Sequence, residues 1–479
     1  MANSFLWYDL ETFGRDPRRT RIAQFAAQRT DAELNPVGEP LSLFCQPALD
    51  LLPSPEATMI TGITPQQALA EGLREAEFMA RLHEEFAQPG TCAVGYNSIR
   101  FDDEFVRFGL YRNFYDPYER EWRNGNSRWD LLDVFRLAHA LRPEGLEWPQ
   151  REDGRGTSFK LEHLALANGV REGDAHEALS DVRALIGLAR KFKAAQPRLW
   201  EYALKLRDKR HVAGLIDITG QMPLLHISQR YPAERLCAAL VLPLAQHPQI
   251  ATRFIVVDLD ADPGPLLRLD ADAIRERLYI RTADLPEGEQ RIPLKEVHSN
   301  KCPVLLPLSH LREADYTRLG IDRERCLQHA ERLRADPALA EKVRRVFASD
   351  GDRAAADADA ALYDGFASEA DKRQFFRVRR ARPEELAGFE TVFADPRYRE
   401  LLFRYRARNW PEQLSEADRV RWNDYRRQRL QGDHTRSEHS FDSYFTELAQ
   451  LRATHPPGPV QALLDALEAW GRTRQAELA

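Results

Sequence analysis

Cysteine is scarce in this chain of 479 residues, and its few occurrences lie far apart. The five cysteines form no CxxC pair, which argues against both a zinc site and a disulfide framework. No run of about 18 apolar residues is present to span a bilayer, and no basic segment near Met1 leads into an apolar stretch of the secretory type. We therefore expect a cytoplasmic protein that is not bound to a membrane.

An excess of positive charge is also missing. The 68 lysines and arginines are outnumbered by 74 aspartates and glutamates, which gives a formal net charge of -6. This charge disfavours binding of nucleic acid over the whole surface, so any such binding must use local basic patches. One patch lies between Pro396 and Leu430, where ten arginines face five acids. Neither a Walker A loop nor a GxGxxG fingerprint occurs, so these two modes of nucleotide binding have no support.

The chain is too long for one hydrophobic core and predicts two to four domains. Residues 1–198 read as a mixed α/β domain, in which the second and third expected strands form a hairpin. The expected strands are Phe5–Leu10, Ile22–Arg29, Leu41–Gln46 and Thr91–Tyr96. Helices are expected to begin at Thr64, where Pro65 takes the first helical position, and at Asp174.

The rest of the chain divides at about residue 350. Residues 199–350 contain short β-like runs and then a helical stretch near Glu324, which together predict a small β-barrel with a helical tail. The runs are Leu224–Ser228, Leu236–Pro243, Phe254–Asp260, Leu278–Arg281 and Ile292–Val297. Residues 351–479 show helical periodicity and almost no strand pattern, so an all-α C-terminal domain is predicted.

Two acids, Asp9 and Glu11, stand at the end of the first expected strand. Alternation along a strand places both carboxylates on the same side. Such close acids repel each other, and each loses favourable hydration when the strand is buried, so this pattern is expected mainly where a cation neutralises them. The sequence therefore predicts a site for divalent metal ions here.

Two further acids and a histidine stand near the starts of expected helices. Asp102 follows the strand that ends near Tyr96, and Asp181 lies five residues after His176 in the helix capped by Asp174. Two cations about 3.5–4 Å apart, held by shared carboxylates, can activate a water and stabilise the leaving oxygen of a phosphodiester. Oxygen-only ligands favour Mg²⁺, with Mn²⁺ as a substitute. His176 would take the proton from that water as general base.

Asp9, Glu11, Asp102, His176 and Asp181, in this order and in these contexts, resemble the catalytic set of the DEDDh family of 3′→5′ exonucleases. Further segments resemble the exodeoxyribonuclease I family within it and extend the resemblance over nearly the whole chain. These segments are Asp9–Gly14 (DLETFG), Tyr111–Tyr118 (YRNFYDPY), Ser127–Asp133 (SRWDLLD), Ala140–Gly145 (ALRPEG), Asn300–Val304 (NKCPV) and Leu401–Asn409 (LLFRYRARN).

The resemblance implies a ribonuclease-H-like α/β nuclease domain, a central Src-homology-3-like β-barrel and a C-terminal all-α domain, which enclose a single DNA strand. It implies an Mg²⁺-dependent enzyme of repair and recombination that degrades single-stranded DNA from the 3′ end and releases 5′-mononucleotides. By the same resemblance, two metal ions are bound by Asp9, Glu11 and Asp181, Asp102 completes the acidic set, and His176 is the base. A chain that encloses its substrate needs no second copy, so we expect a monomer.

Binding of a single strand without sequence preference requires cations for the phosphates and aromatic faces for the bases. The segment from Tyr111 to Trp129 contains both, although the alternative is that half or more of its aromatic residues fill the core. The resemblance implies nucleotide contacts by Glu11 and by Lys160, which stands where the family often has arginine. The full set of expected DNA contacts is Glu11, Thr12, Phe101, Tyr118, Trp122, Arg136, Arg142, Lys160, Lys209 and Lys301.

The resemblance also implies a protein partner, the acidic, phenylalanine-ended C-terminal tail of single-stranded-DNA-binding protein. The matching positions are Arg312, Leu327 and Arg334. Here the two arginines are expected to pair with carboxylates of the tail, and Leu327 to pack against its aromatic end.

Blander alternatives exist for several of these features. An isolated pair such as Asp9 and Glu11 is more often a solvated strand end, and Arg404, Arg406 and Arg408 could form intramolecular ion pairs rather than bind DNA. Two other functions are also open: a DEDDh exonuclease that acts on short RNA or proofreads for a polymerase, and a nucleic-acid-binding scaffold without activity. The two additional domains weigh against the first, and the intact set of four acids and a histidine weighs against the second.

Overall fold

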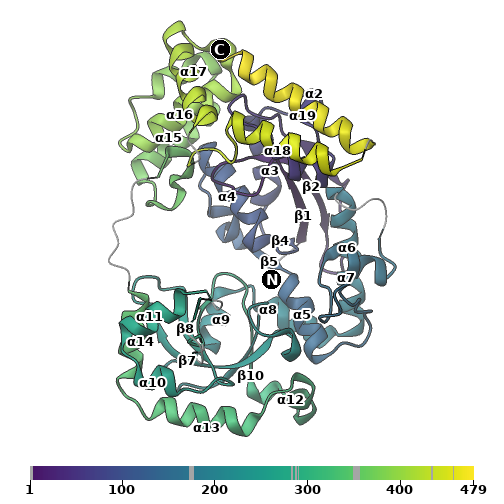
Figure 1. Ribbon diagram of the computed structural model, residues 1–479, viewed down its shortest axis with the longest axis vertical. Helices are drawn as coiled ribbons and strands as arrows, with labels where there is room; N and C mark the ends of the chain where they lie inside the picture. Colours follow the sequence, from purple (N-terminus) through teal and green to yellow (C-terminus); the bar gives the residue numbers. More distant parts are fainter. Residues whose placement is uncertain are drawn as a thin grey trace. The chain divides into compact units, whose positions relative to one another are not determined.

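Two β-sheets organise the chain, which divides into two units (Figure 1). The structure is a computed structural model that describes residues 4–171, 177–281, 284–285, 289, 291–348, 356–432, 435–456 and 458–479. The first unit comprises Met1–Ser127, Glu172–Leu185 and Arg353–Ala479, and the second comprises Arg128–Arg171 and Ile186–Asp352. No helix formed by the described residues combines the length and the apolar character that crossing a bilayer requires.

The sheet of the first unit is built on β1 (Ser4–Thr12), the strand that carries Asp9 and Glu11. β1 pairs in antiparallel fashion with β2 (Ile22–Thr30) and in parallel with β4 (Thr91–Gly95). β2 also pairs with the antiparallel strand β3 (Leu41–Phe44). The four expected strands and the expected hairpin are therefore confirmed.

Alternation along β1 separates an apolar side from an acidic side. Leu6, Tyr8 and Leu10 point into a buried cluster that α3 (Glu75–Ala87) and α4 (Asp102–Arg112) cover. These two helices contribute Phe78, Met79, Leu82, Phe86, Phe105, Val106 and Leu110 to the cluster. Asp9 and Glu11 belong to the other alternate set of residues, so they lie on the opposite face of the sheet.

Expected helix starts are found where the structure describes them. Thr64 precedes α2 (Pro65–Glu71), and its hydroxyl oxygen accepts a hydrogen bond from the N–H of Gln67 at 3.1 Å. Asp102 opens α4, as expected. α7 is described over Ala178–Ala195, so the start predicted at Asp174 lies outside the described residues.

Helices after residue 356 complete the first unit, in agreement with the all-α prediction. They are α15 (Glu369–Arg380), α16 (Pro396–Asn409), α17 (Glu416–Gln431), α18 (Phe441–Thr454) and α19 (Pro459–Ala476), with the 3-10 helices η7 (Ala358–Tyr363), η8 (Pro383–Phe389) and η9 (Pro411–Gln413). α19 contacts both α1 (Pro55–Thr61) and α2, and Figure 1 shows α19 close to α2. The C-terminal helices are thus packed against the first part of the chain.

The second unit holds a five-stranded antiparallel sheet in the order β10-β6-β7-β8-β9. Its strands are β6 (Leu224–Ile227), β7 (Ala238–Gln246), β8 (Arg253–Asp258), β9 (Leu294–His298) and β10 (Val304–Pro307). Four of the five expected β-like runs correspond to β6, β7, β8 and β9. β10 is an additional strand.

The fifth expected run, Leu278–Arg281, is not a strand. Its first two residues end α11 (Ala271–Tyr279), which Asp270 caps by accepting a hydrogen bond from the N–H of Ala273 at 2.9 Å. Ile274 and Leu278 are four residues apart on this helix and both are buried, so the packing of a helical face outweighs the local β propensity.

The remaining helices of the second unit are α5 (Leu132–Leu141), α6 (Leu161–Ala167), α8 (Pro197–Lys205), α9 (Lys209–Leu215), α10 (Gly264–Arg268), α12 (Glu313–Leu319), α13 (Arg323–Arg334) and α14 (Leu339–Phe347). The last two include the helical stretch expected near Glu324, so that prediction is confirmed. β5 (Ser127–Asp130) and α7 run across the division of the chain between the two units.

Candidate metal centre and nuclease site

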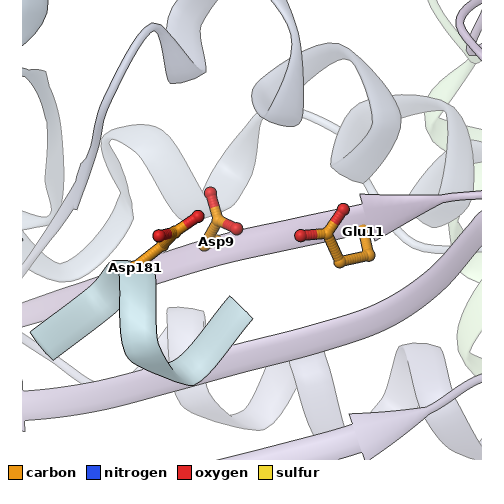
Figure 2. A group of neighbouring side chains, drawn as sticks. All are labelled: Asp9, Glu11 and Asp181. Carbon is orange, nitrogen blue, oxygen red and sulfur yellow. The ribbon is translucent and has the colours of Figure 1, made fainter. Parts of the chain in front are cut away.

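Three carboxylates from two elements converge in the first unit (Figure 2). Asp9 and Glu11 are alternate residues of β1, and Asp181 lies in the first turn of α7. Oxygen atoms of all three lie within 4.8 Å of one another. Within the described ranges, this is the one group of three or more acidic, histidine or cysteine side chains with such spacing.

Burial and mutual repulsion disfavour the ionised form of these acids. Burial is the main cause that raises the pKa of Asp9 well above its usual value, and Asp181 adds to the rise, whereas the N–H of Leu10 opposes it. Burial, followed by Asp9 and Asp181, raises the pKa of Glu11 to about 9. A bound cation would reverse these rises, because it attracts each carboxylate more strongly than the neighbouring acids repel it.

The donor set fits a divalent metal ion. The three side chains offer only carboxylate oxygens, the hard ligands that Mg²⁺ and Mn²⁺ prefer, and the described part of the chain brings no cysteine or histidine into the group. The predicted metal ligands Asp9, Glu11 and Asp181 are therefore brought together, although the first and the last are 172 positions apart in the sequence.

Of the two other predicted catalytic residues, the structure describes only Asp102, which is not part of this group. Asp102 is buried at the start of α4 and contributes, with Asp103, to the raised pKa of Tyr8, after the larger effect of burial. It is not among the three acids within 4.8 Å. His176 lies outside the described residues.

The predicted DNA contacts of the first unit differ in exposure. Thr12 is buried, and its hydroxyl donates to the carbonyl oxygen of Gly14 at 2.6 Å. Phe101 packs partly buried against the core, with its ring centroid 4.9 Å from that of Phe105. Tyr118 is half-buried and lies under the guanidinium of Arg107. Trp122 is 60% exposed, so its ring is open to a base.

Several aromatic residues between Tyr111 and Trp129 fill hydrophobic cores. Tyr111 and Phe114 pack with residues of the C-terminal helices such as Phe375 and Tyr398. In the second unit, Trp129 is buried against Trp200, with the ring centroids 4.9 Å apart. The expectation that part of this segment serves packing rather than DNA is therefore confirmed.

The predicted cations of the second unit are of two kinds. Arg136 and Arg142 are held by acids: Arg136 pairs with Asp133, and Arg142 pairs with Asp315 at 2.8 Å. The exposed ones are Lys160, which makes a 3.4 Å ion pair with Glu162, and Lys209 and Lys301.

The three predicted partner contacts also lie in the second unit. Arg312 is exposed and forms a 3.0 Å ion pair with Asp315, the acid that Arg142 also contacts. Leu327 is half-buried on α13, and the exposed Arg334 at the end of this helix donates to the backbone oxygen of Gln221.

The arginines of α16 form intramolecular ion pairs, which was the alternative to DNA binding. Arg404, Arg406 and Arg408 are buried. Arg404 and Arg408 pair with Asp359 at 3.1 and 2.6 Å, and Arg406 pairs with Asp418 at 3.0 Å. Their charges serve the packing of the first unit, so this stripe is not an open surface for DNA.

One residue near the site was absent from the sequence predictions. The carboxylate of Glu438 accepts hydrogen bonds from the backbone N–H groups of Arg15 and Asp16, in the loop that follows β1. No local motif reveals this contact, because 423 and 422 residues separate the partners.

Three protein-family models match the chain in succession. The exonuclease family matches residues 6–189, the exonuclease I SH3-like domain matches residues 207–349, and the exonuclease I C-terminal domain matches residues 356–474. These matches confirm the predicted fold class of an α/β exonuclease domain, an SH3-like β domain and a helical C-terminal domain. The borders predicted at residues 198 and 350 stay predictions.

Known proteins resemble the chain over most of its length. It is 48% identical over 427 residues to exodeoxyribonuclease I of Escherichia coli strain K12, which covers 89% of this chain and 90% of that protein. A solved structure of a moderately thermophilic exonuclease I from Methylocaldum szegediense has a TM-score of 0.94 and 48% identity, and covers 99% of this chain and 100% of that one. The zinc-bound form of an E. coli exonuclease I complex with single-stranded DNA has a TM-score of 0.94 and 45% identity, with coverage of 99% and 100%.

Proposed function

Because the chain belongs to the exodeoxyribonuclease I family, we propose that it degrades single-stranded DNA in the 3′→5′ direction and releases 5′-mononucleotides in DNA repair and recombination. Family membership makes it a nuclease, a hydrolase that acts on single-stranded DNA. The observation that carries the rest of the proposal is the cluster of Asp9, Glu11 and Asp181, with oxygens within 4.8 Å of one another.

Asp9, Glu11 and Asp181 would hold the metal ions, with Asp102 as the fourth acid of the site. Two Mg²⁺ ions bound there, or Mn²⁺ in their place, would supply an activated water and stabilise the leaving oxygen of the phosphodiester. His176 accepts the proton of the attacking water as general base. These roles rest on the family motif and on the all-oxygen donor set.

The remaining predicted contacts position the strand. Glu11 and Thr12 bind the 3′-terminal nucleotide, and Lys160 contacts its phosphate. Phe101, Tyr118 and Trp122 stack against bases, and the exposed ring of Trp122 supports this assignment. Four cations hold phosphates of the strand, namely Arg136, Arg142, Lys209 and Lys301.

A second proposed ligand is the C-terminal tail of single-stranded-DNA-binding protein. Arg312 and Arg334 are exposed, and half-buried Leu327 lies about two helical turns before Arg334 on α13. This combination of cations and an apolar side chain suits an acidic tail with an aromatic end. Arg334→Glu should weaken binding of the isolated tail peptide; an unchanged affinity would show that the peptide does not bind at Arg334.

We further propose that the enzyme works as a monomer in the cytoplasm.

A cleavage assay tests the function directly. The wild type and Asp181→Ala are each incubated with 5′-labelled single-stranded DNA, its duplex and the equivalent RNA, in Mg²⁺ or in EDTA, and products are resolved by length. We expect progressive shortening from the 3′ end only for single-stranded DNA, only with Mg²⁺ and only for the wild type. Faster cleavage of RNA would assign the chain to short-RNA exonucleases, and binding without cleavage would leave a scaffold.

A further inference from the structure

The first residues of the loop that follows the acidic strand contact a side chain from the far end of the chain, whereas Arg429 donates to the carbonyl oxygen of Arg19 later in the loop. Glu438 lies between α17 and α18, and its Oε1 accepts the backbone N–H of Arg15 at 2.8 Å. The same oxygen accepts the N–H of Asp16, so a single carboxylate oxygen binds two successive backbone donors. Both partners belong to the first unit.

Close packing at Gly14 makes this contact specific. A Cβ atom on Gly14 would stand 2.0 Å from Oε2 of Glu438, so any larger residue here would displace this carboxylate from its present position. Glycine at this position therefore lets the backbone of the loop approach the carboxylate closely. One oxygen of the Glu438 carboxylate thus accepts the N–H groups of Arg15 and Asp16, and the other oxygen lies against Gly14.

The held segment leads directly to the proposed site. Thr12 donates its hydroxyl to the carbonyl oxygen of Gly14 at 2.6 Å, so the position of Gly14 sets the direction of the Thr12 side chain. The pairing of β1 with β2 shifts register between Glu11 and Thr12, which leaves fewer regular ladder contacts to hold this end of the strand. The loop then turns back, because the backbone carbonyl oxygen of Asp16 accepts the N–H groups of Arg19 and Thr20, each at 2.9 Å.

We propose that Glu438 is a positioning residue of the nuclease site, which acts through Gly14–Asp16 to hold Thr12 and Glu11 in place. Its loss leaves two backbone donors without their acceptor and loosens Gly14–Asp16, although Arg112 still donates to the carbonyl oxygen of Pro17 at 2.8 Å. The inference rests on the proposed function in one respect, namely that Glu11 binds metal and that Glu11 and Thr12 bind the nucleotide. Removal of a group that hydrogen-bonds directly to a metal ligand commonly changes metal affinity by about 10–100-fold, and Glu438 acts one step further away through the backbone, so we expect the lower end of this range.

The test compares Glu438→Ala with Glu438→Gln and with Glu412→Ala. The glutamine keeps an oxygen that can accept both N–H groups, whereas alanine keeps none. Glu412 is a matched control, because it also joins a C-terminal segment to the first part of the chain, through a 3.2 Å ion pair with Arg74, but does not touch the loop after β1. Two quantities are measured in each protein: the dissociation constant for Mn²⁺ by calorimetry and the Mg²⁺ concentration for half-maximal cleavage.

For Glu438→Ala, we expect both quantities to rise by about tenfold. Glu438→Gln should return close to the wild-type values, and Glu412→Ala should not change them. A purely structural role would lower the melting temperature and the fraction of active enzyme but leave both quantities unchanged, and that result would overturn the proposal. If neither the wild type nor any variant cleaves DNA but the dissociation constants for Mn²⁺ still differ as expected, the proposed function is wrong while the positioning role stands.

Discussion

Arg408 and Asp50 are 358 residues apart in the chain, and their side chains form a 2.8 Å ion pair that is almost fully buried. Arg408 also pairs with Asp359 at 2.6 Å, and Arg429 lies 3.5 Å from Asp50. This network joins the segment after β3 to η7, α16 and α17 within the first unit. Each charge in it is compensated by its neighbours. Removal of one charge would therefore leave the opposite charges buried without full compensation.

Arg408→Met should therefore destabilise the protein strongly. The substitution keeps much of the side-chain volume but leaves Asp50 and Asp359 with less compensation, and breaking a buried pair in this way costs about 3–5 kcal/mol. Urea denaturation of the metal-free protein measures the loss. Arg382→Met is the control, because Arg382 pairs with Glu385 at the surface, where such pairs contribute about 1 kcal/mol or less. Similar losses in both variants would contradict the importance of the buried network.

Acid should weaken the same network. Burial favours a higher pKa for Asp359, but Arg408 and Arg404 outweigh burial and hold its pKa well below the usual value. A carboxyl with a lowered pKa contributes stability that is fully present above its unfolded pKa of about 3.9 and is lost as the pH falls toward the folded value. We expect the unfolding free energy of the wild type to drop steeply below about pH 5. Asp359→Asn should be less stable at pH 7 and show a shallower drop; parallel curves would refute this explanation.

The metal site should carry a cost in stability when no metal is bound. Burial and the neighbouring acids raise the pKa of Glu11 to about 9 and that of Asp9 well above its usual value. Raised pKa values mean that the folded state holds protons which the unfolded state releases, so these acids reduce stability as the pH rises from about 4 toward 9. Asp9→Asn should thus stabilise the protein in EDTA by roughly 2 kcal/mol at pH 8 and by much less at pH 5.

Thermal unfolding at the two pH values measures this difference. Asp272→Asn serves as the control, because the Asp272 side chain is 89% exposed and should have no comparable effect. Asp9→Asn should also abolish cleavage, since it removes a proposed metal ligand. A variant that is less stable than the wild type at pH 8 would show that the cost of burying the ionised acids, together with their repulsion, does not reduce stability in this way.

Features that depend on a few neighbouring residues could be predicted from the sequence. The alternation of β1 places Asp9 and Glu11 on one face whatever the rest of the chain does, and the Thr64 cap needs only the residues that follow it. The pairing of these acids with Asp181 is not local. It was predicted because the family motif supplies the third acid, and the structure brings it within reach.

Other features depend on partners that no local pattern reveals. The arginines of α16 look like a basic stripe in the sequence, but acids such as Asp50 and Asp359, far away in the chain, neutralise them in the fold. Glu438 lies in a segment without a motif, so its contact with the loop after β1 appears only in three dimensions. The strand predicted at Leu278–Arg281 was wrong for a related reason, because burial of one face of α11 outweighed the local β propensity of this segment.

Exposure distinguishes the aromatic residue that we propose to bind DNA from one that supports the fold. Trp122 is 60% exposed and Trp129 is 1% exposed, although only seven positions separate them. Stacking of one base on an aromatic ring contributes about 1–3 kcal/mol, so Trp122→Ala should weaken binding of a labelled single strand by about 5- to 150-fold without changing the melting temperature. Fluorescence anisotropy in EDTA measures affinity without cleavage.

Trp129→Ala is the matched comparison. Its ring is packed against Trp200 in the second unit, and removal of a buried aromatic side chain costs about 3–5 kcal/mol of stability. At a temperature where this variant is still folded, its affinity for the single strand should remain within about twofold of the wild type, because a difference of that size is less than one stacked base contributes. If Trp122→Ala instead bound DNA normally while Trp129→Ala did not, the exposed ring would be no base-stacking platform, and the strand would follow a path away from Trp122.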